Sequence, residues 1–173
     1  MNIVLIGYRG TGKSEVAAIL CRRLKMECIS MDEKIVERVR ISIPEIVDKY
    51  GWAKFRDLES EVAEELSELD NIVIDTGGGV IERAANIKAL GKNSLIVWLK
   101  ASVDTITARI EDDEGRPALT EGKSFTEEVA EVLERRTPKY KKAAHEEIDT
   151  DPLAPEQVAE QIIKLYHDRM QCG

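Results

Sequence analysis

A glycine-rich segment near the start of the chain carries the residue types that hold a phosphate group. Residues 7–14 read GYRGTGKS and directly follow the apolar run 3–6. The glycines let successive backbone N–H groups turn inward around a phosphate. Lys13 then reaches the β- and γ-phosphates, and the Ser14 hydroxyl binds Mg²⁺. An apolar strand before the segment and a helix after it make an ordinary glycine-rich turn a poor explanation. The segment therefore predicts a P-loop that binds nucleotide phosphates.

Four further groups of residues could do chemistry, and each also has a plainer explanation. Asp32 follows the second apolar run, where it is equally suited to cap a helix at 33–40. Arg56 and Glu59 have the spacing of an exposed i,i+3 pair. The run 76–79, TGGG, lets the backbone approach a ligand closely, although a flexible turn would also use glycine. Arg135 and Arg136 precede Thr137-Pro138, where the end of a helix favours cations without any ligand.

The apolar runs that must position these residues alternate with helical patterns. The runs are 3–6, 26–29, 72–74, 95–99 and, more weakly, the residues around Ile148. This alternation predicts an α/β fold with a parallel sheet that helices cover on both faces. Ligands of such sheets bind at the carboxyl ends of the strands, which draws attention to 7–14, 30–32 and 75–79. The polar segment 111–123, with Arg116 next to Pro117, is predicted to be a mobile lid.

Helix signals between the strands are local and specific. Ser42 and Glu45 have capping-box spacing around Pro44, and Gly51 is predicted to stop that helix. Four apolar residues on the next helix form a stripe that we interpret as core, namely Leu58, Val62, Leu66 and Leu69. A last helix is predicted from Pro155 to about residue 170.

Length and composition set limits on function. The chain of 173 residues suits one domain, and its net charge of −8 argues against nucleic acid or an anionic membrane as a partner. No apolar run approaches the ~20 residues of a membrane span, and no signal peptide is recognisable. Cys21, Cys28 and Cys172 lack metal-ligand spacing, which is typical of reduced thiols in a cytosolic enzyme.

Taken together, the motifs resemble those of the shikimate kinases along nearly the whole chain. The matching segments are GYRGTGKS, Asp32, GWAKFRDLE, TGGG, VWLKA, RPAL, RRTPKY and the Asp-Thr pair before the last helix. The resemblance implies a three-layer α/β sandwich of the nucleoside-monophosphate-kinase type with a five-stranded parallel sheet. Residues 1–173 would form one domain, with a core at about 1–31, 72–110 and 145–173, a substrate-binding region at about 32–70 and a lid at about 111–123. The implied reaction is phosphoryl transfer from ATP to the 3-hydroxyl of shikimate, by a cytoplasmic monomer that uses Mg²⁺.

The resemblance also implies a role for each matching residue. Arg56 and Arg136 would hold the shikimate carboxylate, because a guanidinium fork suits a carboxylate better than an ammonium does. Gly78 and Gly79 would lie against the ring, and Asp32 would bind hydroxyls and accept a proton. Lys13 and Arg116 would neutralise charge during transfer. The expected ATP-binding residues are Gly10, Thr11, Gly12, Lys13, Ser14, Glu15, Arg109, Arg116 and Pro155.

Three positions depart from the family pattern, and they concern metal and nucleotide rather than acceptor. Ser30 stands where an acidic residue is usual, Glu15 replaces a hydroxyl residue, and Leu153 replaces an arginine found in some members. Asp75, at the end of the third strand run, is a further departure. It either supplies Mg²⁺ with outer-shell charge that Ser30 no longer provides, or caps the turn into TGGG; both interpretations stay open.

Two alternatives to a shikimate kinase also stay open at this point. One is a kinase of another small hydroxylated substrate, such as gluconate or a nucleotide. The other is a nucleotide-binding module that has lost efficient transfer. The presence of Lys13, Ser14, Asp32 and Arg116 in one chain argues against the second alternative.

Overall fold

A five-stranded parallel sheet forms the centre of the protein. The computed structural model describes residues 1–110 and 124–172. The strands are β1 (Asn2–Ile6), β2 (Glu27–Ser30), β3 (Ile72–Asp75), β4 (Ser94–Lys100) and β5 (Glu146–Asp149). They lie in the order β2-β3-β1-β4-β5, and every pairing is parallel. The predicted α/β class and five-stranded parallel sheet are thereby confirmed, whereas the predicted lid, Arg116 included, lies outside the described residues.

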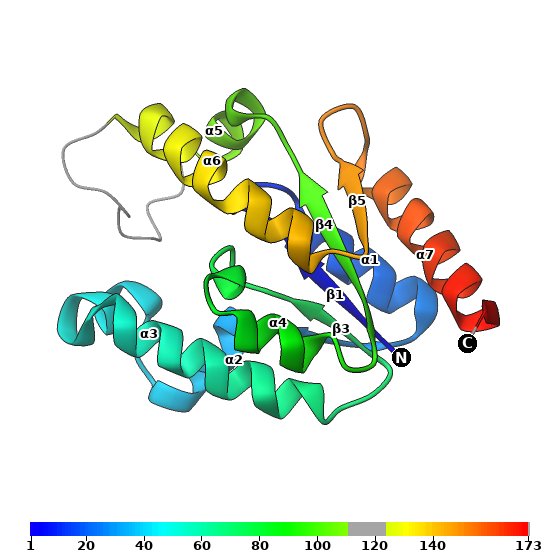
Figure 1. Ribbon diagram of the computed structural model, residues 1–173, viewed down its shortest axis with the longest axis horizontal. Helices are drawn as coiled ribbons and strands as arrows, with labels where there is room; N and C mark the ends of the chain where they lie inside the picture. The colour runs from blue at the N-terminus through cyan, green and yellow to red at the C-terminus, as the bar shows by residue number, and fades with distance from the viewer. Residues whose placement is uncertain (111–123, 173) are drawn as a thin grey trace.

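Helices cover both faces of the sheet and make three layers (Figure 1). Their bounds are α1 (Lys13–Leu24), α2 (Met31–Val39), α3 (Ile43–Ser67), α4 (Ala84–Leu90), α5 (Val103–Ile110), α6 (Phe125–Ala143) and α7 (Pro155–Cys172), with a short 3₁₀ turn at Val80–Glu82. In the ranges 1–110 and 124–172, none of these helices has the length and apolar character needed to cross a membrane.

Alternation along the strands assigns each helix to a face. Ile3 and Leu5 of β1 belong to a core cluster with α1 and α7, whereas Val4 and Ile6 belong to a cluster with α2, α3 and α4. Successive side chains of a strand point to opposite faces, so one short apolar strand contributes to both clusters. Figure 1 shows α1 and α7 side by side on one face of the sheet. This arrangement fixes the helix that follows the P-loop firmly against the sheet.

The carboxyl ends of β1, β2 and β3 meet at one edge of the sheet. Asp75 at the end of β3 is in register with Leu5 of β1 on one side and with Ser30 of β2 on the other. β3 therefore separates β2 from the P-loop strand. Asp75 therefore lies on the strand next to β1, whereas Ser30 lies one strand farther from the P-loop.

The start of α2 shows that Asp32 is not the cap of this helix, which was one of its two interpretations. The N-cap of α2 is Ser30, whose Oγ accepts a hydrogen bond from the Glu33 backbone N at 3.3 Å. Asp32 lies inside the first turn of the helix and is not its cap. The hydroxyl of Ser30 thus does the capping that we considered for Asp32, and Asp32 lines a cavity next to the P-loop.

One predicted helix end is confirmed and another is wrong. Gly51 has non-helical angles, φ 80° and ψ 166°, so α3 consists of two helical segments that meet at a kink there, the second ending at Ser67. By contrast, α6 runs through Pro138 to Ala143, so Arg136 lies within the helix and not near its C-terminus. The predicted capping box at Ser42 and Glu45 is present in full.

The apolar stripe on α3 predicts a sharp contrast in stability. Leu66 is 0% exposed in the core, whereas Leu69, just beyond the helix, is 41% exposed. Replacing Leu66 with Ala should lower the free energy of unfolding by about 2–5 kcal/mol, because it leaves a cavity. Leu69→Ala should change it by less than about 1 kcal/mol. Urea unfolding of both variants measures the difference, and equal losses would contradict the assignment of Leu66 to the core.

Candidate active site

The P-loop wraps around the ammonium group of Lys13. Gly10 and Gly12 have φ angles of 78° and 85°, a left-handed conformation that glycine adopts without a steric penalty. The loop places the carbonyl oxygens of Gly7 and Tyr8 each 3.0 Å from Lys13 Nζ, which donates to both. Lys13 is only 7% exposed, so its charge is confined to the interior of the loop.

A cavity next to this loop, here called the P-loop cavity, collects the oxygen-bearing side chains predicted for this edge. Its lining includes Lys13, Ser14, Ser30, Asp32 and Asp75. Ser14 Oγ donates a hydrogen bond to Asp75 Oδ2 at 2.5 Å. Hydroxyl and carboxylate oxygens are the donors that Mg²⁺ takes, so these residues fit a magnesium ion held together with nucleotide phosphates.

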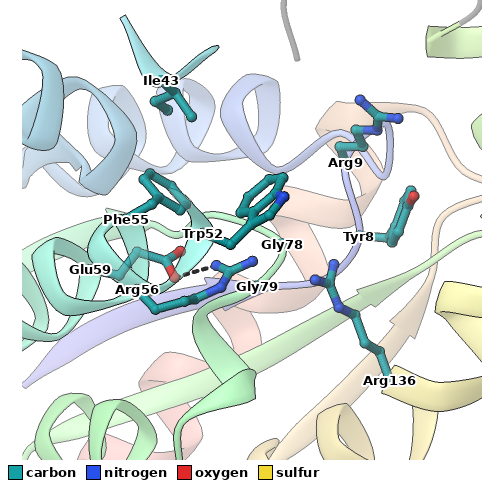
Figure 2. A pocket seen from close by; sticks show the side chains of 10 residues that line it. All are labelled: Tyr8, Arg9, Ile43, Trp52, Phe55, Arg56, Glu59, Gly78, Gly79 and Arg136. Carbon is teal, nitrogen blue, oxygen red and sulfur yellow. Dashed lines mark hydrogen bonds and ion pairs between the residues drawn. The ribbon is translucent and has the colours of Figure 1, made fainter. Parts of the chain in front are cut away.

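A second pocket, here called the arginine pocket, is shown in Figure 2. Figure 2 shows Arg56 of α3 and Arg136 of α6 reaching toward the same space next to Gly78 and Gly79. The full lining is Tyr8, Arg9, Ile43, Trp52, Phe55, Arg56, Glu59, Gly78, Gly79 and Arg136. Arg9 and Gly78 line both cavities, so the two spaces share a wall.

Arg56 is held by an acidic residue on its own helix. It pairs with Glu59, and the two side chains are 14% and 1% exposed, so this is a buried pair and not the surface pair that its spacing alone indicates. Burial raises the pKa of Glu59, although the positive charge of Arg56 opposes the shift. The Arg56 guanidinium also lies 5.3 Å from the Trp52 ring centroid. The ion pair with Glu59 and the contact with the Trp52 ring together fix the direction in which Arg56 points.

Close contact between this guanidinium and the backbone explains Gly79. A Cβ atom at position 79 would lie 2.1 Å from Arg56 Nη1 and 2.3 Å from Nη2. A Cβ at Gly77 would lie 2.9 Å from Asp32 Oδ1 and 3.1 Å from Glu59 Oε1. At two glycines of the TGGG run, a Cβ atom would therefore displace a neighbouring charged side chain from the position that it has in this structure.

Arg136 is oriented by Glu82, which follows the TGGG turn. Arg136 Nε donates to Glu82 Oε1 at 2.7 Å, and the Arg136 side chain is 5% exposed. Glu82 also pairs with Arg135 and Lys139. Partial burial works to raise the pKa of Glu82, but hydrogen bonds from Lys139 and Arg136 outweigh it and lower the pKa from 4.5 to about 2. The pair uses the Nε edge of Arg136 and leaves its tip directed at the pocket (Figure 2).

A third cavity also borders the P-loop. Arg109 of α5 donates from Nη1 to the Gly10 carbonyl at 3.1 Å. Arg109 lines this cavity together with Thr11, Gly12, Glu15, Leu153 and Pro155, among others. Every residue predicted for ATP binding, apart from Arg116 in the segment outside the described residues, thus lines this cavity or the P-loop cavity.

Comparison with known proteins decides the family. The family model described as "Shikimate kinase" matches residues 9–167. A shikimate kinase of Thermodesulfovibrio yellowstonii is 41% identical over 172 residues, 99% of this chain and 98% of that protein. One of Caldicellulosiruptor bescii is 38% identical over 165 residues, 95% of each chain. The structure of Acinetobacter baumannii shikimate kinase in complex with shikimate superposes with a TM-score of 0.92 at 32% identity, covering 97% of this chain and 93% of that one.

The chain belongs to the shikimate kinase family. Shikimate kinases are ATP-dependent phosphotransferases that act on an alcohol, and this is the activity of the present protein. Membership agrees with the motifs that pointed to it, from the P-loop at residues 7–14 to the final helix.

Several residues of a shikimate kinase pocket escaped prediction from the sequence. Tyr8 and Arg9 fall at the positions of the P-loop that its function leaves unspecified, so no pattern marks them. Trp52 and Phe55 read as ordinary apolar residues of a helix. Glu82 could have been suspected only from its place three residues after Gly79, because its partner Arg136 is more than fifty positions away.

The ion pairs of Glu82 predict a pH-dependent contribution to stability. A carboxyl whose pKa is lowered in the folded state stabilises the protein above its unfolded pKa, and that stabilisation is lost as the pH falls toward 2. Glu82→Gln should therefore be less stable than the parent at neutral pH, and the gap should narrow as the pH is lowered to about 3.

Urea unfolding at several pH values measures this gap. Glu68→Gln is the matched control, since the exposed pair of Glu68 with Lys92 contributes little. A gap for Glu82→Gln that stays constant from neutral to acid pH would show that its ion pairs do not stabilise the fold.

Proposed function

We propose that the arginine pocket binds shikimate through its carboxylate and that the P-loop cavity presents the γ-phosphoryl group of ATP to the 3-hydroxyl of shikimate. The observation that carries this assignment is the convergence of Arg56 and Arg136, from two different helices, on a pocket that shares a wall with the P-loop cavity. On this proposal the substrate-binding region is about 32–70, and residues about 1–31, 72–110 and 145–173 form the core.

Two guanidinium groups suit a carboxylate on a small ring. Each guanidinium has five N–H donors, so an internal acid such as Glu59 or Glu82 can orient it and still leave donors for a ligand. Paired N–H groups fit both oxygens of a carboxylate. Gly78 and Gly79 offer a flat backbone surface for the ring, and the Gly78 carbonyl is fixed by a 2.5 Å hydrogen bond from Tyr140 Oη.

ATP would lie along the P-loop with its base toward Arg109 and Pro155. Backbone N–H groups of residues 10–14 and Lys13 would hold the phosphates, and Ser14 would be the protein ligand of Mg²⁺. When bound, the metal neutralises charge that develops on the transferring group. Thr11, Gly12 and Glu15 line the cavity assigned to the nucleoside.

Asp32 is the candidate for handling the acceptor hydroxyl. Its carboxylate lines the P-loop cavity and approaches Gly77, the residue that separates it from Glu59 of the arginine pocket. From this place it would bind a hydroxyl and accept its proton as the oxygen attacks. Lys13 would stabilise the charge on the phosphoryl oxygens. The same role for Arg116 stays a prediction, as do the monomeric state and the cytoplasmic location.

Release of ADP with different acceptors tests the reaction directly. Shikimate should support turnover, whereas gluconate and nucleoside monophosphates at the same concentration should not, because neither matches a compact ring that bears one carboxylate. Turnover with gluconate or a nucleotide in preference to shikimate would overturn the acceptor assignment.

Neighbouring arginines on α6 offer a matched pair of variants. Arg136→Ala should raise KM for shikimate by about 30-fold or more, since loss of one partner of a desolvated charge pair costs at least about 2 kcal/mol. Arg135, with a 60% exposed side chain, serves as the control, and Arg135→Ala should leave KM nearly unchanged. Steady-state kinetics with both substrates varied should show little change in KM for ATP. Equal effects of the two variants would remove Arg136 from carboxylate binding.

A further inference from the structure

The hydroxyl at the start of α1 is tied to an acid on a neighbouring strand. Ser14 Oγ donates to Asp75 Oδ2 at 2.5 Å, and the two residues line the P-loop cavity together with Lys13. Asp75 is the last residue of β3, which pairs directly with the P-loop strand β1. The acid is therefore placed by the sheet itself and not by a loop.

The equivalent position on the next strand carries no acid. Ser30 ends β2 and is in register with Asp75. Its hydroxyl caps α2 by accepting from the Glu33 backbone N, so its side chain has a structural partner of its own. Of the two strand ends β2 and β3 that meet at this edge, only β3 brings a carboxylate to Ser14.

The structure also answers whether Asp75 caps the turn into the glycine run. Thr76 secures that turn, because its backbone N and its Oγ1 both donate to the Leu5 carbonyl, at 3.3 Å and 2.7 Å. Within the described part of the chain, the hydrogen bond of the Asp75 carboxylate goes to Ser14 and not to the turn. The capping interpretation is thereby wrong.

We propose that Asp75 is the acidic positioning residue of the magnesium site in this chain. Its carboxylate, at the end of β3, supplies the negative charge that Ser30, at the end of β2, does not have. The proposal rests on the proposed function in that the ligand of the site is a Mg²⁺–nucleotide complex. By accepting the hydrogen bond from the Ser14 hydroxyl, Asp75 directs the lone pairs of Ser14 Oγ away from itself and toward a cation. Its negative charge also favours a divalent ion beside Lys13. Such supporting partners commonly change metal affinity by about 10- to 100-fold.

Nucleotide binding without an acceptor tests the proposal. The affinity for the non-hydrolysable β,γ-imido analogue of ATP is measured by calorimetry over a Mg²⁺ titration and in EDTA. For the parent protein, Mg²⁺ should tighten binding. Asp75→Ala should shift the Mg²⁺ midpoint upward by about tenfold or more, while affinity in EDTA is maintained or improved, because a negative charge near the phosphates is gone.

A second substitution separates lost charge from lost structure. Ser30→Asp in the Asp75→Ala background returns a carboxylate to the adjacent strand end and should restore most of the Mg²⁺ dependence. Asp48 is an exposed acid on α3, and Asp48→Asn removes the same single negative charge as Asp75→Ala but should leave the Mg²⁺ midpoint in place. Thermal unfolding of each variant checks that the fold is kept.

The outcomes distinguish this inference from the assignment of the acceptor. An unchanged Mg²⁺ midpoint in Asp75→Ala would overturn the inference about the magnesium site. An equal loss of nucleotide affinity in EDTA and in Mg²⁺ that Ser30→Asp does not rescue would also overturn it. None of these measurements contains shikimate. A failure of shikimate phosphorylation would leave the metal inference standing, and a failed Mg²⁺ titration would leave the acceptor pocket as proposed.

Discussion

The site depends on keeping two guanidinium groups, one buried and one largely buried, pointed at one small pocket. Arg56 and Arg136 come from helices that no local signal brings together, and each is fixed by its own acid, Glu59 or Glu82. A buried charge that lacks a partner is costly, so these acids let the arginines remain charged away from water. They also set direction, which matters because a carboxylate is bound best by two parallel N–H groups. In this orientation the Arg56 guanidinium lies so close to Gly79 that a Cβ atom there would collide with it.

The other constraint is the parallel sheet, which brings the P-loop cavity and the arginine pocket to one edge. Because β3 lies next to β1, the end of β3 supplies Asp75 to Ser14 and continues directly into the glycine run. One strand end therefore contributes to the P-loop cavity and, a few residues later, to the arginine pocket. Gly78, which lines both cavities, lies where the two cavities meet.

Much of this could be predicted from sequence, because strands, caps and the P-loop depend on neighbouring residues. The capping box at Ser42 and the alternation of strands and helices are local signals of that kind. The break in α3 at Gly51 is another. The passage of α6 through Pro138 could not be predicted, since the local preference of proline is to end a helix. Glu82 was missed for a related reason: its role exists only through a partner on another helix. Likewise the sequence left two roles for Asp75, and its hydrogen bond with Ser14 became visible only in the structure.

The central claim is that the pocket recognises a carboxylate through two oriented arginines. The most direct measurement compares, by calorimetry, the binding of shikimate with that of its neutral carboxamide, which keeps the ring and all hydroxyls. The account predicts that the carboxamide binds at least about 30-fold more weakly to the parent protein. It also predicts that this preference largely disappears when Arg56 and Arg136 are both replaced by Ala. Equal affinities for shikimate and its carboxamide in the parent protein would contradict the account.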